Sequence, residues 1–145
     1  KRDLYLEQFK NSELDSLYAI SNKIQPNYLK GDFDGNGNED IVYLIKEKQS
    51  GKIGLVFLHQ DNSVFVIAAG KEFDSKWDEM NWLDILELDK NKIQYEMLID
   101  DETSDIIGEK EITIPNIGIR IREEEGSGGL LYFEKGEYKY LHQGD

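Results

Sequence analysis

The chain has no cysteine among its 145 residues, and this absence excludes several kinds of site. There can be no disulfide framework, no zinc–thiolate centre and no thiol nucleophile. Histidine is almost as scarce, since His59 and His142 are the only 2 in the sequence. Neither has a serine or a carboxylate at a diagnostic spacing, so we expect both to be surface residues at strand ends rather than catalytic bases.

Basic residues are also in short supply, with 17 Lys and Arg against 30 Asp and Glu, a formal net charge of −13. Nucleic acids and anionic lipids need a basic footprint, so the sequence excludes them as partners. The chain has no apolar run close to the roughly 20 residues that cross a membrane, so no transmembrane segment is expected. The acidity suits a cation-binding protein or one that meets a basic partner.

Hydrophobic residues make up 39% and aromatic residues 11% of the chain, which predicts a globular fold. We expect one domain over residues 1–145, with an N-terminal helical segment over 1–26 and a β-meander over 27–145. Residues 3–24 carry apolar side chains at helical spacing, with a break near Asn11 that would give two short helices. Pro26 ends this segment, because its ring disfavours the α conformation at Gln25. The spaced positions are Leu6, Phe9, Leu14, Leu17, Tyr18 and Ile24.

Short apolar runs separated by turn residues follow at hairpin spacing. The runs 41–45 and 53–58 are apolar on both faces, which indicates central strands. Three hairpins are expected, with strands at 53–58 and 64–68, at 83–88 and 93–99, and at 130–133 and 138–141. The predicted fold is therefore α+β and mostly β, with one helix or two short helices before an antiparallel meander of about seven to eight strands.

The segment Asp32-Phe33-Asp34-Gly35-Asn36-Gly37-Asn38-Glu39-Asp40 places oxygen-bearing side chains at alternate positions around two glycines. Ca²⁺ takes six to eight oxygen ligands, and a short loop supplies them only if glycine permits sharp bends. An EF-hand is excluded, because its twelfth position holds Tyr43 instead of glutamate and a strand follows. The alternative is that these Asp and Asn side chains only cap their own backbone in an Asx-turn.

Residues 31–41 resemble the calcium loops of FG-GAP repeats, as in integrin-type and VCBS-type propellers. The resemblance implies that Ca²⁺ is held by the side chains of Asp32, Asp34, Asn36 and Asp40 and by the carbonyl of Asn38. The motif occurs once, so the resemblance extends to the loop and not to a propeller of several blades. The rest of the chain resembles small exported or lipid-anchored proteins of Bacteroidetes-type bacteria that have no assigned activity.

A second, weaker candidate site is the polar stretch that contains Trp77, Asp78 and Trp82. Aromatic rings beside carboxylates are typical of grooves that bind carbohydrates or peptides. The same composition is also typical of a loop packed over a sheet, and the sequence leaves both alternatives open.

These observations predict a calcium-stabilised, non-enzymatic binding domain of an exported bacterial protein, monomeric, with a protein or glycan as partner. We expect it to be secreted, periplasmic or surface-anchored, with a lipid anchor on a removed N-terminus as one alternative and the cytoplasm as another. Two other functions stay open. One is a metal-dependent hydrolase that acts on a glycan or phosphoester, and the other is an acidic inhibitor-type protein that covers a basic partner.

Overall fold

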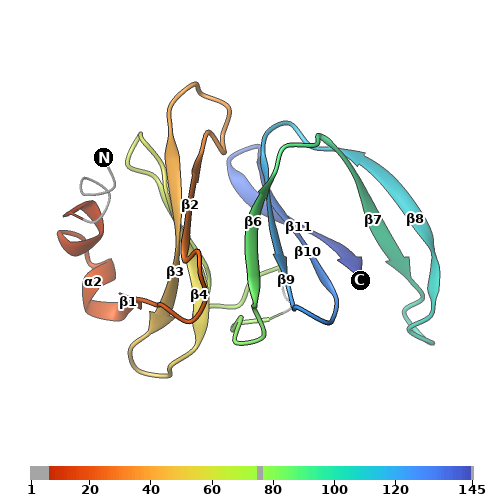
Figure 1. Ribbon diagram of the computed structural model, residues 1–145, viewed down its shortest axis with the longest axis horizontal. Coiled ribbons are helices and arrows are strands. Elements are labelled where there is room, and N and C mark those ends of the chain that lie inside the picture. Colours follow the sequence, from red (N-terminus) through yellow and green to blue (C-terminus); the bar gives the residue numbers. More distant parts are fainter. Residues whose placement is uncertain (1–6, 75–76, 145) are drawn as a thin grey trace. The chain divides into compact units, whose positions relative to one another are not determined.

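The computed structural model describes residues 7–74 and 77–144, which fold mainly into antiparallel β-sheet after two short helices (Figure 1). The predicted fold class is therefore confirmed. The chain forms two compact units. The first unit runs to Gly31 and continues over Asn38–Asn81, and the second comprises Asp32–Gly37 and the chain from Trp82 onwards.

The helical segment is shorter than the sequence predicted. Residues 7–10 are helical and α2 spans Leu14–Leu17, but Tyr18–Ile20 form the strand β1. The prediction of helix to residue 24 is therefore wrong, and residues 3–6 lie outside the described part. β1 pairs with Glu47, Lys46 and Ile45, and this pairing buries Tyr18. A helix of four residues is marginal by itself, so pairing with a neighbouring strand overrides the helical periodicity.

The sheet of the first unit is built on two fully apolar strands. Its strands are β1, β2 (Tyr28–Gly31), β3 (Asp40–Glu47), β4 (Ile53–Leu58) and β5 (Val64–Ala68), in the order β1-β3-β4-β5, with β2 also paired to β3. β1 and β2 pair with different parts of β3: β2 with residues 40–43 and β1 with residues 45–47. β4 is buried along its whole length, as are the first six residues of β3, which confirms the prediction of central strands.

Alternate residues of β3 and β4 face one hydrophobic core. Ile41, Tyr43 and Ile45 lie with Val56 and Leu58 on this face, and the side chains of Phe9 and Tyr18 pack against them. The period-two alternation of strands puts all five strand residues on the same side of the sheet. The packing of this core therefore fixes the positions of the ends of β3 and β4, where Asp40 and His59 lie.

The second unit contains a four-stranded sheet and a separate two-stranded one. The first has the order β11-β10-β9-β6, and β7 pairs with β8 in the second. The strands are β6 (Ile85–Asp89), β7 (Ile93–Ile99), β8 (Ile106–Thr113), β9 (Gly118–Arg122), β10 (Gly128–Glu134) and β11 (Glu137–Gly144). The predicted hairpin of 130–133 with 138–141 is confirmed, since Leu130 lies opposite Leu141 and Phe133 opposite Tyr138.

The predicted hairpin of 83–88 with 93–99 is wrong, because β6 pairs with β9 instead of β7. Leu86 lies opposite Ile121 and Leu88 opposite Ile119, so apolar side chains meet across this pair of strands. Such cross-strand apolar pairs stabilise a sheet, and here they form between β6 and β9 in place of the predicted hairpin. β7 continues past the turn and pairs with β8 as a hairpin of its own, drawn in green and cyan in Figure 1.

Within the described residues, no helix has the length and apolar character needed to span a membrane.

Candidate metal centre

The acidic loop connects β2 to β3, and the antiparallel pair of Gly31 with Asp40 closes it. The carboxylate of Asp32 organises the loop. Its Oδ1 accepts hydrogen bonds from the backbone N–H groups of Gly35 at 2.9 Å and Asn36 at 3.1 Å, and its Oδ2 accepts one from Gly37 at 2.8 Å. A carboxylate offers about four lone-pair positions, so roughly one remains for a cation. Asp32 therefore has room to be a monodentate ligand.

Two glycines and one buried aromatic ring determine the conformation of the loop. Gly35 and Gly37 have φ angles of +75° and +89°, in the left-handed region that side chains disfavour. Phe33, between the first two aspartates, is fully buried and anchors the loop. Asn36 and Asn38 are exposed, and the N–H of Asn36 also donates to Asp34 Oδ1 at 3.2 Å. The backbone capping expected of an Asx-turn is thus present, and an ion would add to it rather than replace it.

Asp40 is placed by the sheet and not by the loop. It is the first residue of β3, it is 0% exposed, and its Oδ1 accepts a hydrogen bond from the backbone N–H of Gln60 at 3.1 Å. His59 follows directly after β4 and is 1% exposed. Its ring centroid lies 5.0 Å from that of Phe65. The prediction of a surface histidine is therefore wrong for His59, whereas His142 is half-buried in β11.

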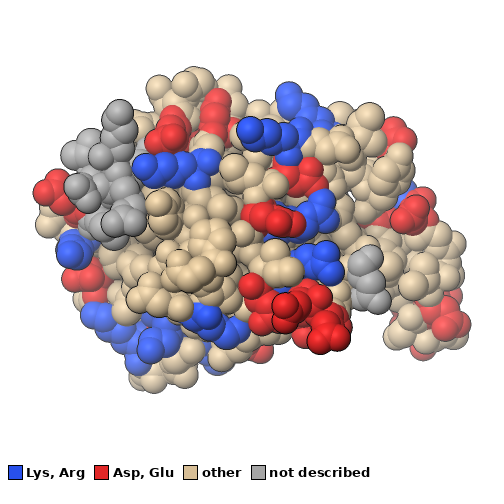
Figure 2. All heavy atoms as spheres, viewed as in Figure 1, with Lys and Arg blue, Asp and Glu red and all other residues tan. Residues whose placement is uncertain are grey.

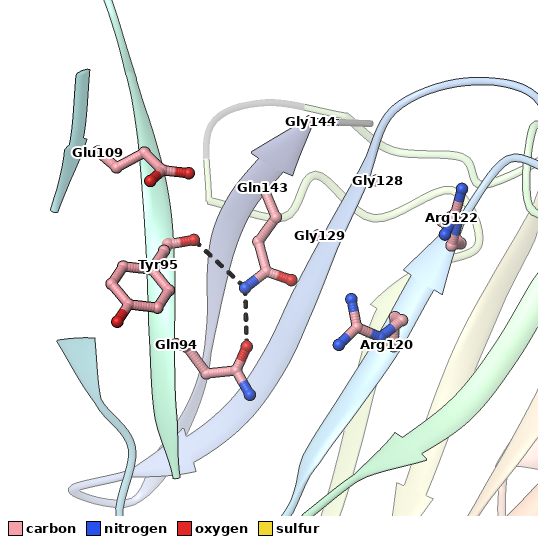
Figure 3. A pocket seen from close by; sticks show the side chains of 9 residues that line it. All are labelled: Gln94, Tyr95, Glu109, Arg120, Arg122, Gly128, Gly129, Gln143 and Gly144. Carbon is pink, nitrogen blue, oxygen red and sulfur yellow. Dashed lines mark hydrogen bonds between the residues drawn. The ribbon is translucent and has the colours of Figure 1, made fainter. Parts of the chain in front are cut away.

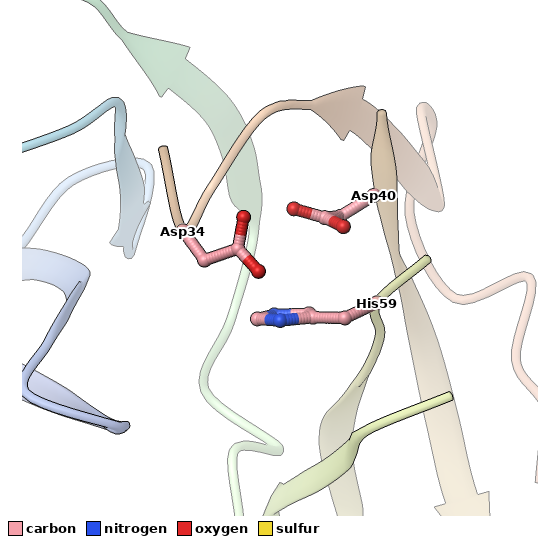
Figure 4. Close-up of side chains that lie close together, drawn as sticks. All are labelled: Asp34, Asp40 and His59. Atoms are coloured by element: carbon pink, nitrogen blue, oxygen red, sulfur yellow. The ribbon is translucent and has the colours of Figure 1, made fainter. Parts of the chain in front are cut away.

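Figure 4 draws the side chains of Asp34, Asp40 and His59. Asp34 belongs to the second unit, whereas Asp40 and His59 belong to the first, at the ends of β3 and β4. Asp34 and Asp40 are only six residues apart in one closed loop, so chain connectivity keeps them near each other. Two of the predicted ligands thus belong to this loop, and in the first unit Asp40 lies next to His59, which the sequence analysis had not considered as a ligand. The carboxylate of Asp32 accepts hydrogen bonds from the loop backbone.

The chemistry of these groups suits a cation. Carboxylates in one short loop repel each other, and a bound cation relieves the repulsion. Carboxylate and carbonyl oxygens are the ligands that Ca²⁺ prefers, so Asp34, Asp40 and the loop oxygens fit that ion. The imidazole of His59 is a nitrogen donor and is more typical of a transition-metal site. The contact of its ring with Phe65 contributes to the burial of His59.

The second candidate site, Trp77, Asp78 and Trp82, is not assembled as a groove within either unit. Trp77 and Asp78 belong to the first unit and Trp82 to the second. The carboxylate of Asp78 forms an ion pair with Lys52 at 2.6 Å, and this hydrogen bond lowers the pKa of Asp78. The ring of Trp77 packs 5.3 Å from that of Phe73. Trp77 and Asp78 thus make contacts that are typical of a loop packed over a sheet.

Comparison with protein-family models, with curated proteins and with solved structures finds no match to this chain.

Proposed function

We propose that the β2–β3 loop binds Ca²⁺ and that the protein is a calcium-stabilised, non-enzymatic binding domain of an exported bacterial protein. The observation that carries this proposal is the donor set at the start of β3. Asp34 and Asp40 both offer carboxylate oxygens from one short loop that the pair of Gly31 with Asp40 closes, and three backbone N–H groups already shape the loop around Asp32. The order of the donors along residues 31–41 supports Ca²⁺ through its resemblance to FG-GAP loops.

A structural role for the ion is favoured over a catalytic one by burial. Asp40 is 0% and His59 is 1% exposed, so neither presents its polar atoms to a substrate in solution. A hydrolase needs carboxylates that face a cleft, with a spacing that leaves room for the scissile bond. The ion would instead neutralise the carboxylates where the loop joins β3 and hold that end of the sheet together.

The inhibitor-type alternative gains no support from the charge distribution on the face drawn in Figure 2. There, Lys and Arg atoms are interspersed with Asp and Glu atoms rather than separated from them. Steering a basic partner requires a broad field of one sign.

The test is thermal unfolding of the whole chain in Ca²⁺ and in EDTA, together with calorimetric titration of Ca²⁺. An ion present at a hundred times its Kd adds about 2.7 kcal/mol of stability. For a chain of this size, that corresponds to a rise in Tm of roughly 5–10 °C. Equal midpoints in the two buffers, with no heat of Ca²⁺ binding, would sink the proposal.

A further inference from the structure

The exposed hydrophobic side chains of the described residues are concentrated in the hairpin of β7 and β8. All of the large ones except Leu17 and Val64 belong to these two strands. The most exposed are Ile106 at 65% and Ile107 at 64%, at the start of β8. Exposed apolar side chains that gather on one element, instead of being scattered singly, mark an interaction surface.

The strand β7 contacts both β8 and β11, whereas β8 is paired only with β7. Gln143 of β11 donates from its Nε2 to Gln94 Oε1 at 2.9 Å and to the carbonyl of Tyr95 at 3.3 Å (Figure 3). These bonds fix β7 beside β11. A cavity of about 230 Å³ lies at the same place, and its lining includes Gln94, Glu109 and Arg122.

The outer edge of β8, on the side away from β7, is a row of unpaired backbone groups. In the described part of the chain, β8 pairs with no strand other than β7, and no backbone hydrogen bond is made along its outer edge. Alternate residues of such an edge direct N–H and C=O groups outward, where they can pair with another extended chain. A two-stranded hairpin is marginal in water, so a third strand would stabilise it. In Figure 1 β8, drawn in cyan, is the outermost strand on this side of the second unit.

The two faces of β8 differ in chemistry. Ile112 is half-buried and packs against a small hydrophobic core of the second unit. Alternation along the strand places Glu109 and Glu111 on the opposite face, and both are exposed. Neither carboxylate forms a hydrogen bond or an ion pair with a described residue. An added strand would therefore need apolar side chains on the face of Ile112 and cationic side chains on the face of the two glutamates.

The charge of this edge argues against a second copy of the chain as the added strand. Antiparallel pairing about a two-fold axis places residues of the same face opposite each other. In the central registers Glu109 would lie opposite Glu109 or Glu111 of the second copy, and like charges directly opposite each other destabilise a sheet. Between residues 100 and 111, every charged residue except Lys110 is acidic. The edge therefore favours a basic strand.

We propose that the outer edge of β8 accepts an extended basic segment of a partner protein as a third strand. Lys or Arg side chains of this segment lie opposite Glu109 and Glu111, and its apolar side chains lie on the face of Ile112. In strand addition the main-chain hydrogen bonds supply the affinity and the alternate side chains supply the specificity. The recognition is local and needs no broad field of charge. This role rests on the proposed function as a binding domain and is independent of Ca²⁺.

The probe is a peptide of alternating Lys and Val, as long as the 8 residues of β8 and blocked at both ends, titrated calorimetrically into the whole chain. A peptide of alternating Glu and Val should bind at least about tenfold more weakly, because it places like charges opposite each other. Hydrogen exchange should slow in β8 when the Lys–Val peptide is bound.

N-methylation of the probe separates strand addition from attraction by charge. Two forms of the Lys–Val peptide, methylated at the backbone nitrogen of every Val or of every Lys, keep the charge and remove backbone donors. At least one of them should lose binding, since one set of donors faces β8. If both forms bind as the parent peptide does, the proposal is overturned.

Charge variants of the edge have a matched control. Replacing Glu109 and Glu111 together by Lys should weaken binding of the Lys–Val peptide at least about tenfold. Replacing both by Gln should weaken it less, and this variant still tests the edge if the Lys variant does not fold. The same double change to Lys at Glu124 and Glu125, which are exposed in the turn between β9 and β10, should leave binding unchanged.

Three outcomes overturn the proposal. One is no binding of the Lys–Val peptide at about 1 mM, and another is equal weakening in the edge variants and in the control. The third is a dimer of the unchanged protein that the edge variants alter, because it would assign the edge to a second copy. Peptide binding should be equal in Ca²⁺ and in EDTA, so its failure would leave the difference between the calcium melts intact and the two proposals are tested separately.

Discussion

Asp40 and His59 lie opposite each other, one position beyond Ile41 and Leu58, the last paired residues of β3 and β4. Both are almost completely buried, and the N–H of the next residue, Gln60, donates to Asp40 at 3.1 Å. The register of the sheet therefore fixes one carboxylate and one imidazole at the base of the acidic loop. This relationship places Asp40 and His59 at the end of two buried central strands.

Replacing Asp40 by Asn is predicted to weaken Ca²⁺ binding without lowering the stability of the ion-free protein. The Asn side chain keeps an oxygen that accepts from the N–H of Gln60, but the substitution removes one of the carboxylate charges of the loop. We expect the Ca²⁺ affinity to fall at least about tenfold, because ligand charge tunes calcium affinity. In EDTA the variant should be as stable as the unchanged protein or more stable, since the repulsion with Asp34 is gone.

Calorimetry and thermal melts in both buffers measure these two effects. Asp101→Asn is the matched control, because Asp101 is an exposed carboxylate in the turn after β7. A variant of Asp40 that binds Ca²⁺ as tightly as the Asp101 variant would contradict the assignment of Asp40 as a ligand.

Replacing His59 by Ala is predicted to cost stability without affecting Ca²⁺. The ring is buried against Phe65, so its removal should lower the free energy of unfolding by about 2–3 kcal/mol. The Ca²⁺ affinity should change by less than about threefold, because calcium takes oxygen ligands. Denaturant unfolding and calorimetry give the two values. His142→Ala, at a half-buried position, should cost less stability. A large loss of affinity in the His59 variant would instead identify the imidazole as a ligand and favour a transition metal.

The two loop glycines are predicted to differ in their tolerance of a methyl group. Both have positive φ angles, and the Cβ of an alanine at position 37 would have nothing within 4 Å. Gly37→Ala should therefore cost about 1–2 kcal/mol from backbone conformation alone. A Cβ on Gly35 would clash with the side-chain amide of Asn116, which would have to move aside, so Gly35→Ala should cost somewhat more. Denaturant unfolding of both variants in EDTA measures the difference.

The excess cost at Gly35 should disappear when Asn116 is also replaced by Ala, since that removes the crowded atom. If Gly35→Ala remains the more damaging change in the Asn116→Ala background, close approach to Asn116 is not the cause.

Tyr140 in β11 is predicted to make stability depend on alkaline pH. Burial raises the pKa of its hydroxyl to about 12 from the ordinary value of 10.0. A folded-state pKa above the unfolded one contributes stability that is present below pH 10 and is lost as the pH rises to about 12. Melts of the unchanged protein and of Tyr140→Phe across this range test the idea, because the Phe variant should lose stability less steeply. Parallel curves for the two proteins would contradict it.

Much of this architecture can be predicted from local patterns. The apolar runs that became β3 and β4 are buried on both faces, and the hairpin of β10 with β11 follows from the turn Glu134-Lys135-Gly136 between two apolar runs. These features depend on residues close in sequence, where alternation and turn chemistry act directly. The position of His59 was also within reach, because pairing 41–45 with 53–58 around their turn places residue 59 opposite residue 40.

Local sequence patterns were sufficient to predict the central strands, the hairpin at the end of the chain and the spacing of the oxygen donors in the acidic loop, because each depends on neighbours within a few residues. Three other features became visible only in the folded chain: Tyr18–Ile20 pair with β3, β6 pairs with β9, and Gln94, Glu109 and Arg122 line one cavity. Those outcomes join residues far apart along the chain, and they depend on which apolar faces are buried together rather than on any local pattern.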